Sequence, residues 1–198
     1  MSQDSFTTAA SAHVREIGAA GPKPEHEALR RAYLDLLKLS LCDLVGAETR
    51  QVWSSNPSRL FSRALIGETQ LRWRADGTDW PLNGLTMIGL TRLDDLQACV
   101  ESIVADGIPG DLIEAGTWRG GASMLMRATL DTLEAPQRDV WLADSFQGFP
   151  LPEARGTDRE LEQDMSAIDY LAPDVDDVRG YFGRLGLDEG VRFVPGFF

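Results

Sequence analysis

The sequence predicts an α/β fold in which about three parallel strands alternate with helices. Three apolar runs of strand length support this prediction: Leu112–Ile113, Asp139–Asp144 and Val191–Val194. A stretch with apolar residues at helical spacing separates the first two runs, and a strand, a helix and a second strand form a βαβ unit. The strands of such a unit are parallel, and its crossover is right-handed.

A glycine-rich turn and the start of a helix follow the first strand, within residues 111–123. We expect Leu112 and Ile113 to form a short buried strand that ends at Glu114. Gly116, like the two glycines after it, has no Cβ and lets a ligand approach closely, and a helix N-terminus offers free N–H groups. Because open α/β sheets bind ligands at the carboxyl ends of their strands, we expect a cofactor site here.

The later elements extend the same pattern. The helix after the turn is expected to end near Glu134–Pro136, and a second helix is expected from Asp174 to Leu185, with Gly186 ending it. Residues 149–172 are acidic and loop-like, with a short helix expected over 158–166. Since only three strands are visible, the first strand should lack a ladder partner on one edge. We therefore expect a truncated gene product, or completion by another chain.

The region before the sheet is predicted to be helical, with a long irregular insertion. Residues 1–24 are polar and small, which is typical of a flexible tail. A helix of about twenty residues begins at Glu25 and is expected to stop near Gly46, with its apolar stripe at Leu29, Tyr33, Leu36, Leu37, Leu41 and Leu44. It could cover the cofactor domain or pair with its copy in a dimer. We assign 25–107 to a helical or lid region and 108–198 to half of a cofactor domain.

Residues 47–83 have no clean period and contain Trp53, Trp73 and Trp80. Long irregular segments of this kind are lids, binding loops or disordered, and the aromatics argue against disorder throughout. Thr86 is predicted to cap a further helix, with an apolar stripe from Met87 to Ile103 and an end at Gly107. Alternatively, the start of this helix points into the crevice beside Glu114.

Composition and charge argue against several classes of binding partner and of protein location. The 198 residues carry 19 basic and 31 acidic side chains, a net charge of −12, which disfavours nucleic-acid and anionic-membrane partners. No signal peptide or membrane span is apparent, so we expect a cytoplasmic protein. Cys42 and Cys99 lie in apolar helical patterns and are expected to be buried free thiols.

The spacing of the glycines and acids favours one type of nucleotide cofactor over another. A dinucleotide fingerprint needs G-x-G-x-x-G, whereas the glycines here are Gly116, Gly120 and Gly121. A carboxylate at Glu114 suits a cationic group, such as the ammonium of S-adenosylmethionine (SAM). Asp144 is placed to accept both ribose hydroxyls, with Ser145 and Phe146 flanking the adenine.

Structural alternatives stay open for each of these residues. Glu114 could be a helix-cap carboxylate, and Asp144 could cap the turn that follows it. Arg119 could bind the cofactor carboxylate or pair with one of the acids nearby.

Three stretches resemble the macrocin O-methyltransferase family most closely: TMIGLTRLDDLQ (86–97), GDLIEAGTWRGGA (110–122) and WLADSFQGFP (141–150). Residues 33–38, 171–179 and 191–198 are similar to the family as well, so the resemblance covers roughly 30–198. It implies the first half of a Rossmann-like class I methyltransferase fold, with an N-terminal helical extension. It also implies SAM as methyl donor, usually Mg²⁺, and sugar hydroxyls of macrolide or aminocoumarin antibiotics as acceptors.

Transferred residue by residue, the resemblance places Thr86, Glu114, Arg119, Gly121, Asp144 and Ser145 in the SAM site. The family's metal-binding aspartates and proposed base lie on later strands, so no catalytic or metal residue is assigned here. Asp174, Asp176 and Asp177 are no substitutes, because acids at a helix start complement its dipole.

The leading hypothesis is a SAM-dependent O-methyltransferase acting on a sugar hydroxyl of a small glycosylated metabolite. The alternative is an inactive SAM-binding fragment or a partner-dependent half-domain. A nicotinamide-linked oxidoreductase is a distant third, and homo-oligomerisation stays open.

Overall fold

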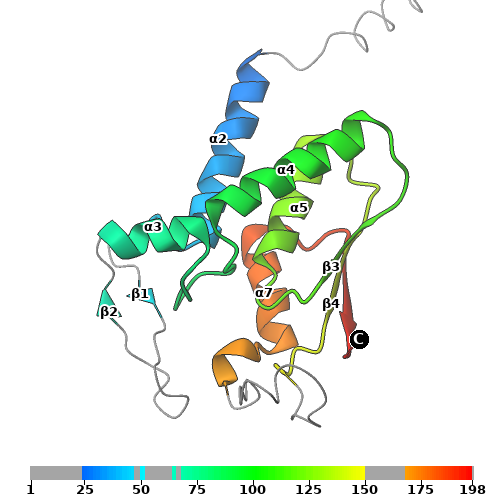
Figure 1. Ribbon diagram of the computed structural model, residues 1–198. Coiled ribbons are helices and arrows are strands. Elements are labelled where there is room, and N and C mark those ends of the chain that lie inside the picture. The colour runs from blue at the N-terminus through cyan, green and yellow to red at the C-terminus, as the bar shows by residue number, and fades with distance from the viewer. Residues whose placement is uncertain (1–23, 47–49, 52–63, 66–67, 150–167, 198) are drawn as a thin grey trace, which may run out of the picture. The chain divides into compact units, whose positions relative to one another are not determined.

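The computed structural model describes residues 24–46, 50–51, 64–65, 68–149 and 168–197 (Figure 1). The chain divides into two compact units, residues 1–35 and residues 36–198. The predicted tail, Trp53 and the short helix expected over 158–166 lie outside the described residues. The elements, in order, are α2 (Pro24–Leu41), β1 (Arg50–Gln51), β2 (Ala64–Leu65), α3 (Glu68–Asp76), α4 (Gly89–Ala105), β3 (Leu112–Ala115), α5 (Gly121–Thr132), β4 (Val140–Asp144), η1 (Asp169–Leu171), α7 (Val175–Leu185) and β5 (Val191–Pro195).

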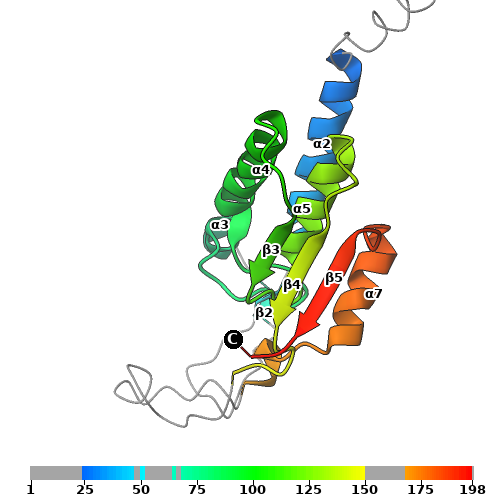
Figure 2. The ribbon, with the colours of Figure 1, turned by 90° about the vertical axis from the view of Figure 1, so that its right-hand side faces the viewer.

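The predicted parallel sheet is present, with strand order β3-β4-β5 (Figure 2). Both strand pairs are parallel, and Glu114, Leu142 and Phe193 stand in one row across the sheet. The short strands β1 and β2 form a separate antiparallel pair. The sequence therefore predicted the three parallel strands and their α/β class correctly.

The strand β3 lies at one edge of the sheet, and only one of its two faces is covered. Because side chains alternate across a strand, Leu112 and Glu114 share one face while Ile113 and Ala115 share the other. The first pair is partly buried, whereas Ile113 is 68% exposed. The expectation that Ile113 is buried was wrong, since no described element packs over its face. The unpaired edge, in contrast, was expected.

Two helices cover the face of the sheet that carries Leu142 and Phe193. The Phe182 ring of α7 packs edge-on against Phe193, with centroids 5.8 Å apart. A Cβ on Gly120, just before α5, would meet Phe182 and Leu142 side chains at 3.0 and 3.2 Å. Figure 1 shows α5 and α7 on the same side of the strands. This packing fixes the turn after β3 against the sheet.

Local capping fixes α7 as predicted. The Asp174 carboxylate accepts a hydrogen bond from the N–H of Asp176 at 2.7 Å, and this N-cap satisfies a donor that the first turn leaves free. At the other end Gly186 adopts φ +65°, the left-handed conformation that commonly ends a helix.

The first helix is shorter than predicted, and its apolar stripe is only partly buried. It ends at Leu41 rather than near Gly46. Leu37 and Leu41 are buried as expected, but Leu29, Tyr33 and Leu36 are exposed at 68%, 42% and 56%. A periodic stripe shows that a face is apolar, and it does not show that another element covers that face.

The irregular region contains a helix, α3, which the sequence pattern did not predict. Few apolar residues occur in α3, so it shows no stripe. Its residue Arg74 is 2% exposed and donates from Nε to both Asp79 carboxylate oxygens at 2.8 Å. Arg74 also donates to the Cys42 carbonyl at 3.2 Å. Such a buried ion pair depends on tertiary contacts and leaves no periodic signal.

Two further local expectations were wrong. Thr86 does not cap α4: the N-cap is Ile88, and the Thr86 hydroxyl accepts a hydrogen bond from the N–H of Ile88 at 3.3 Å, which makes a local turn. Cys99 is exposed on α4, while Cys42 is buried, and both are free thiols. Among the described residues, no helix is long and apolar enough to cross a membrane.

Candidate cofactor site at the carboxyl ends of the strands

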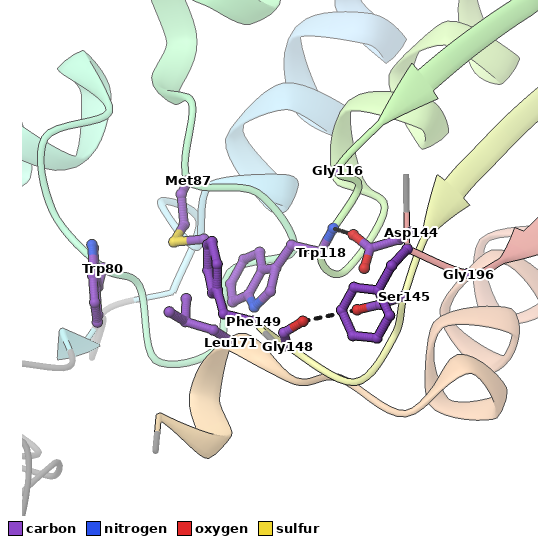
Figure 3. Close-up of a pocket in the computed structure, with 11 residues that line it drawn as sticks. Trp80, Met87, Gly116, Trp118, Asp144, Ser145, Gly148, Phe149, Leu171 and Gly196 are labelled. Carbon is purple, nitrogen blue, oxygen red and sulfur yellow. Dashed lines mark hydrogen bonds between the residues drawn. The ribbon is translucent and has the colours of Figure 1, made fainter. Parts of the chain in front are cut away.

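A cavity of about 580 Å³ opens where the three parallel strands end (Figure 3). Gly116 follows β3, Asp144 ends β4 and Gly196 follows β5, so each strand contributes to its wall. The full lining is Trp80, Met87, Gly116, Trp118, Asp144, Ser145, Gly148, Phe149, Leu171, Gly196 and Phe197. Its volume is in the range of small-molecule sites, and its place is the usual one for a ligand in an open α/β sheet.

Asp144 joins the turn after β3 to the turn after β4. Its Oδ2 accepts hydrogen bonds from the N–H groups of Thr117 at 2.7 Å and Trp118 at 3.0 Å. Its Oδ1 accepts from the N–H of Phe146 at 2.9 Å. A carboxylate offers about four acceptor positions, and these bonds use three of them. Asp144 therefore holds the cavity wall together and retains capacity to accept from a ligand hydroxyl.

Glu114 lies near the end of β3 and is not among the residues that line the cavity. Its carboxylate accepts hydrogen bonds from the N–H of Ser123, at 3.0 Å, and from the Ser123 hydroxyl. The pKa of the Glu114 carboxyl is raised to about 7, chiefly because the group is buried; the two bonds from Ser123 act against this rise, and the Asp144 charge adds to it. The Glu114 carboxylate therefore caps the first turn of α5, as one of the two interpretations of the sequence expected. No cationic side chain among the described residues contributes to its pKa.

The glycines of the turn serve different purposes. Gly116 adopts φ +79°, and a Cβ there would meet nothing within 4 Å. Gly121 is packed tightly: its N–H donates to the Leu85 carbonyl at 2.9 Å, and a Cβ would lie 2.5 Å from that same oxygen. Gly116 therefore leaves room in the cavity, whereas Gly121 allows α5 to contact the segment before α4.

The described contacts of Arg119 are with backbone carbonyls and aromatic rings, and not with an acidic side chain. It donates to the carbonyls of Leu82 and Gly84, both at 2.9 Å. Its guanidinium lies 4.3 Å from the centroid of the Trp118 ring. Arg119 thus fastens the 82–84 loop to the glycine-rich turn, and it is absent from the cavity lining.

Of the remaining predicted residues, one lines the cavity and two do not. Ser145 lines it, and its hydroxyl donates to the Gly148 carbonyl at 2.9 Å. Phe146 points instead toward Phe193, with ring centroids 6.0 Å apart. Thr86 is buried, and its Cβ would lie 2.8 Å from a Cβ on Gly121.

Sequence reasoning missed an aromatic cluster beside the cavity: Trp80 and Trp118 line the cavity, and both pack against Tyr170, which is outside the lining. The rings of Trp80 and Tyr170 stack with centroids 5.7 Å apart and planes 9° from parallel. The Tyr170 hydroxyl donates to the Pro81 carbonyl at 2.6 Å, and Trp118 Nε1 donates to the Tyr170 carbonyl at 2.9 Å. The only sequence signals were the tryptophan inside the glycine-rich turn and Trp80 in the irregular region.

No metal centre is apparent in the described part of the chain. Within it, no group of three or more His, Cys, Asp or Glu side chains could hold a metal ion. Asp176 and Asp177 stay at the start of α7, where Asp176 pairs with Arg179 at 2.7 Å.

Comparisons with known proteins agree with this architecture. Residues 30–198 match the family described as Macrocin-O-methyltransferase (TylF). The chain is 42% identical over 176 residues to 8-demethyl-8-(2,3-dimethoxy-alpha-L-rhamnosyl)-tetracenomycin-C 4'-O-methyltransferase from Streptomyces olivaceus, covering 87% of this chain and 63% of that relative. It is 39% identical over 172 residues to Mycinamicin III 3''-O-methyltransferase from Micromonospora griseorubida, covering 84% of this chain and 64% of that relative.

The solved structure of the O-methyltransferase NovP is similar too, with a TM-score of 0.70 and 36% identity, covering 84% of this chain and 64% of that chain. The chain thus spans a little under two thirds of these proteins. With the family match over residues 30–198 and the shared fold, the chain belongs to the macrocin O-methyltransferase family.

Proposed function

We propose that the protein transfers a methyl group from SAM to a sugar hydroxyl of a small glycosylated metabolite of the antibiotic type. The observation that carries the proposal is the cavity at the strand ends, which Gly116 and Asp144 line, together with the buried carboxyl of Glu114 near the end of β3. Family membership supports the reaction class, and the names of both relatives describe O-methyltransferases.

Asp144 is the proposed anchor for the ribose of the cofactor. Three backbone N–H groups hold its carboxylate in place, so its orientation is set before any ligand binds. The acceptor capacity that it retains suits a ribose hydroxyl. Ser145 stands beside it in the lining, and Gly116 lets the ligand come close to the backbone.

Glu114 is the proposed counter-charge for the cofactor ammonium. A partly buried carboxyl with a raised pKa and no cationic partner among the described residues gains most from a ligand that brings a positive charge. Four other predicted residues do not line the cavity, and we propose that they support the residues that do: Thr86, Arg119, Gly121 and Phe146.

The apolar part of the lining is proposed to face the acceptor. Trp80, Met87 and Leu171 offer a surface suited to the apolar body of a glycosylated metabolite. SAM, when bound, supplies an electrophilic methyl group. The chain's own residues then contribute binding and orientation, which are the main protein contributions when two reactants must meet in line.

The described residues do not offer a ligand set for the divalent ion that the family resemblance implies, so the proposal includes no step through it. No residue described here is assigned as the base that takes the hydroxyl proton.

Isothermal titration with S-adenosylhomocysteine tests the cofactor claim. We expect saturable binding that Asp144→Asn weakens about 10-fold, because the amide replaces one acceptor oxygen by a donor, a loss on the order of 1.4 kcal/mol. The matched control is Asp188→Asn at an exposed position outside the cavity lining, and it should bind as the parent does. Absence of saturable heat in a folded sample would falsify the proposal, as would equal affinity of the two variants.

A further inference from the structure

The loop between α3 and α4 supplies one side of the cavity. Residues 77–88 form no helix or strand, yet Trp80 and Met87 of this loop line the cavity. Figure 3 shows Trp80 on the side of the cavity away from Asp144. Because no regular backbone ladder holds this loop, contacts with other segments fix where Trp80 lies.

Four backbone carbonyls of this loop accept hydrogen bonds from other segments of the chain. They are the carbonyls of Pro81, Leu82, Gly84 and Leu85. Arg119 and Gly121, which follow the strand β3, donate to the last three at 2.9 Å. Tyr170 of η1 donates from its hydroxyl to the first at 2.6 Å. Since Pro81 follows Trp80 directly, the bond from Tyr170 is the one of the four that is made next to Trp80.

Tyr170 also contacts the Trp80 ring itself. The two rings stack with centroids 5.7 Å apart and planes 9° from parallel, which is a favourable arrangement for an aromatic pair. Tyr170 is 6% exposed and is absent from the cavity lining, whereas Trp80 is only partly buried and belongs to the lining. Tyr170 therefore fixes both the plane of the Trp80 ring and the backbone beside it.

Tyr170 is itself held by residues of the glycine-rich turn. Trp118 Nε1 donates to the Tyr170 carbonyl at 2.9 Å, and the two ring centroids lie 5.1 Å apart. The Arg119 guanidinium lies 5.1 Å from the centroid of the Tyr170 ring. The position of the buried Tyr170 ring is therefore set before any ligand binds.

We propose that Tyr170 is a positioning residue that holds Trp80 in one orientation as an apolar platform for the acceptor. It acts through Trp80, because Tyr170 does not line the cavity. A platform fixed in advance favours binding, since less side-chain and loop entropy is lost when the ligand arrives. The acceptor class that fits is a glycoside whose apolar body has a flat face to lie on the indole. This inference rests on the proposed function, because that proposal assigns Trp80 to the acceptor.

Titration of the full 198-residue chain with two separate ligands tests the proposal. The acceptor probe is 4-methylumbelliferyl β-D-glucoside, an aromatic glycoside, and the cofactor probe is S-adenosylhomocysteine. Tyr170→Phe keeps the ring stack and removes the donor to Pro81. We expect affinity for the glucoside to fall about 5-fold, the effect of one neutral hydrogen bond, while affinity for S-adenosylhomocysteine stays within about 2-fold.

The matched control is Tyr181→Phe, which removes a hydroxyl from α7 at a residue outside the cavity lining. It should leave both affinities as they are in the parent. Circular dichroism and the midpoint of thermal unfolding check that both variants fold.

Two further measurements ask whether Tyr170 acts through Trp80. In a Trp80→Ala background, Tyr170→Phe should change glucoside affinity by less than about 1.5-fold, because effects transmitted through a shared partner are not additive. Fluorine NMR of the chain labelled with fluorotryptophan follows the Trp80 signal, which is identified by its absence from Trp80→Ala. Without any ligand, Tyr170→Phe should shift or broaden that signal and leave the Trp141 signal from β4 unchanged.

Equal loss of affinity for both ligands in Tyr170→Phe would overturn the proposal, as would an unaltered glucoside affinity or an unaltered Trp80 signal. The same loss in the Trp80→Ala background would also contradict it, and failure of Tyr170→Phe to fold would assign Tyr170 to stability instead. A parent chain that binds no glucoside overturns it whether or not S-adenosylhomocysteine binds. A parent chain that binds the glucoside alone contradicts the proposed cofactor and leaves the Tyr170 comparison to decide this inference.

Discussion

The turns after β3 and β4 both contain a strand-end carboxylate, yet the two carboxylates occupy different environments. Asp144 lines the cavity and accepts three backbone N–H groups from both turns. Glu114 is not among the lining residues, is bonded only to Ser123 among the hydrogen bonds described, and has a raised pKa. The position at a strand end places both acids near the same region. The hydrogen-bond donors around each acid then differ: those around Asp144 make it join the two turns, whereas Glu114 has few donors and a raised pKa.

The largest expected effect is loss of the Asp144 anchor. Asp144→Ala leaves three N–H groups without their charged acceptor, which should lower the free energy of unfolding by about 4 kcal/mol at more than 1 kcal/mol per bond. Urea denaturation at pH 7 measures it, with Asp188→Ala as the exposed control. A loss below about 1 kcal/mol would mean that water replaces these bonds and that the two turns do not depend on Asp144.

The next largest effect is a pH dependence of the stability that is expected from Glu114. The pKa of Glu114 in the folded protein, about 7, lies above its ordinary 4.5, so the folded state holds a proton that the unfolded state has lost between these values. Stability from this group is therefore fully present below pH 4.5 and is lost as pH rises through 7.

Glu114→Gln removes this titration and keeps an acceptor for Ser123. We expect the variant to gain on the parent as pH rises from 5 to 8, by at most about 3 kcal/mol at 1.36 kcal/mol per pKa unit. Thermal unfolding at pH 5, 6.5 and 8 measures it, with Glu189→Gln at an exposed position as the control. A pH-independent difference would show that Glu114 does not titrate between pH 5 and 8 and would contradict its raised pKa.

The smallest effect concerns the donor that holds Glu114. Ser123 is fully buried, and Ser123→Ala removes one hydrogen bond, so unfolding should become easier by about 1 kcal/mol. The loss should be greater at pH 8 than at pH 5, since the hydroxyl stabilises the ionised carboxyl. Ser102→Ala, on the exposed face of α4, provides the control under the same urea protocol. An equal loss at both pH values would show that Ser123 supports only the start of α5.

Much of the frame was predictable because local patterns encode it. The apolar run before Asp144 predicted β4, the spacing from Val178 to Leu185 predicted α7, and Asp174 and Gly186 marked its ends. The acids at the ends of β3 and β4 and the glycines between them predicted a cofactor site at the strand ends, where the structure has a cavity; its use by a cofactor stays a prediction. Such features depend on neighbours a few residues apart, which a single sequence displays directly.

The site's other components were not predictable in this way, because their partners are distant in the chain. Trp118 bonds to Tyr170, which is 52 residues away, and Arg119 to Leu82, which is 37 away. Buried Arg74 bonds to the carbonyl of Cys42, which is 32 residues away, and α3 has no apolar stripe that would have predicted this helix.

The sequence by itself determined the parallel strands, the glycine-rich turn, the two carboxylates and the resemblance to a methyltransferase family. Only the tertiary structure decided which groups surround each carboxylate, that Arg119 fastens a loop, and that Ile113 lies bare rather than buried. The reason is physical: apolar periodicity shows that a surface needs cover, but the cover itself comes from elements that local patterns do not specify.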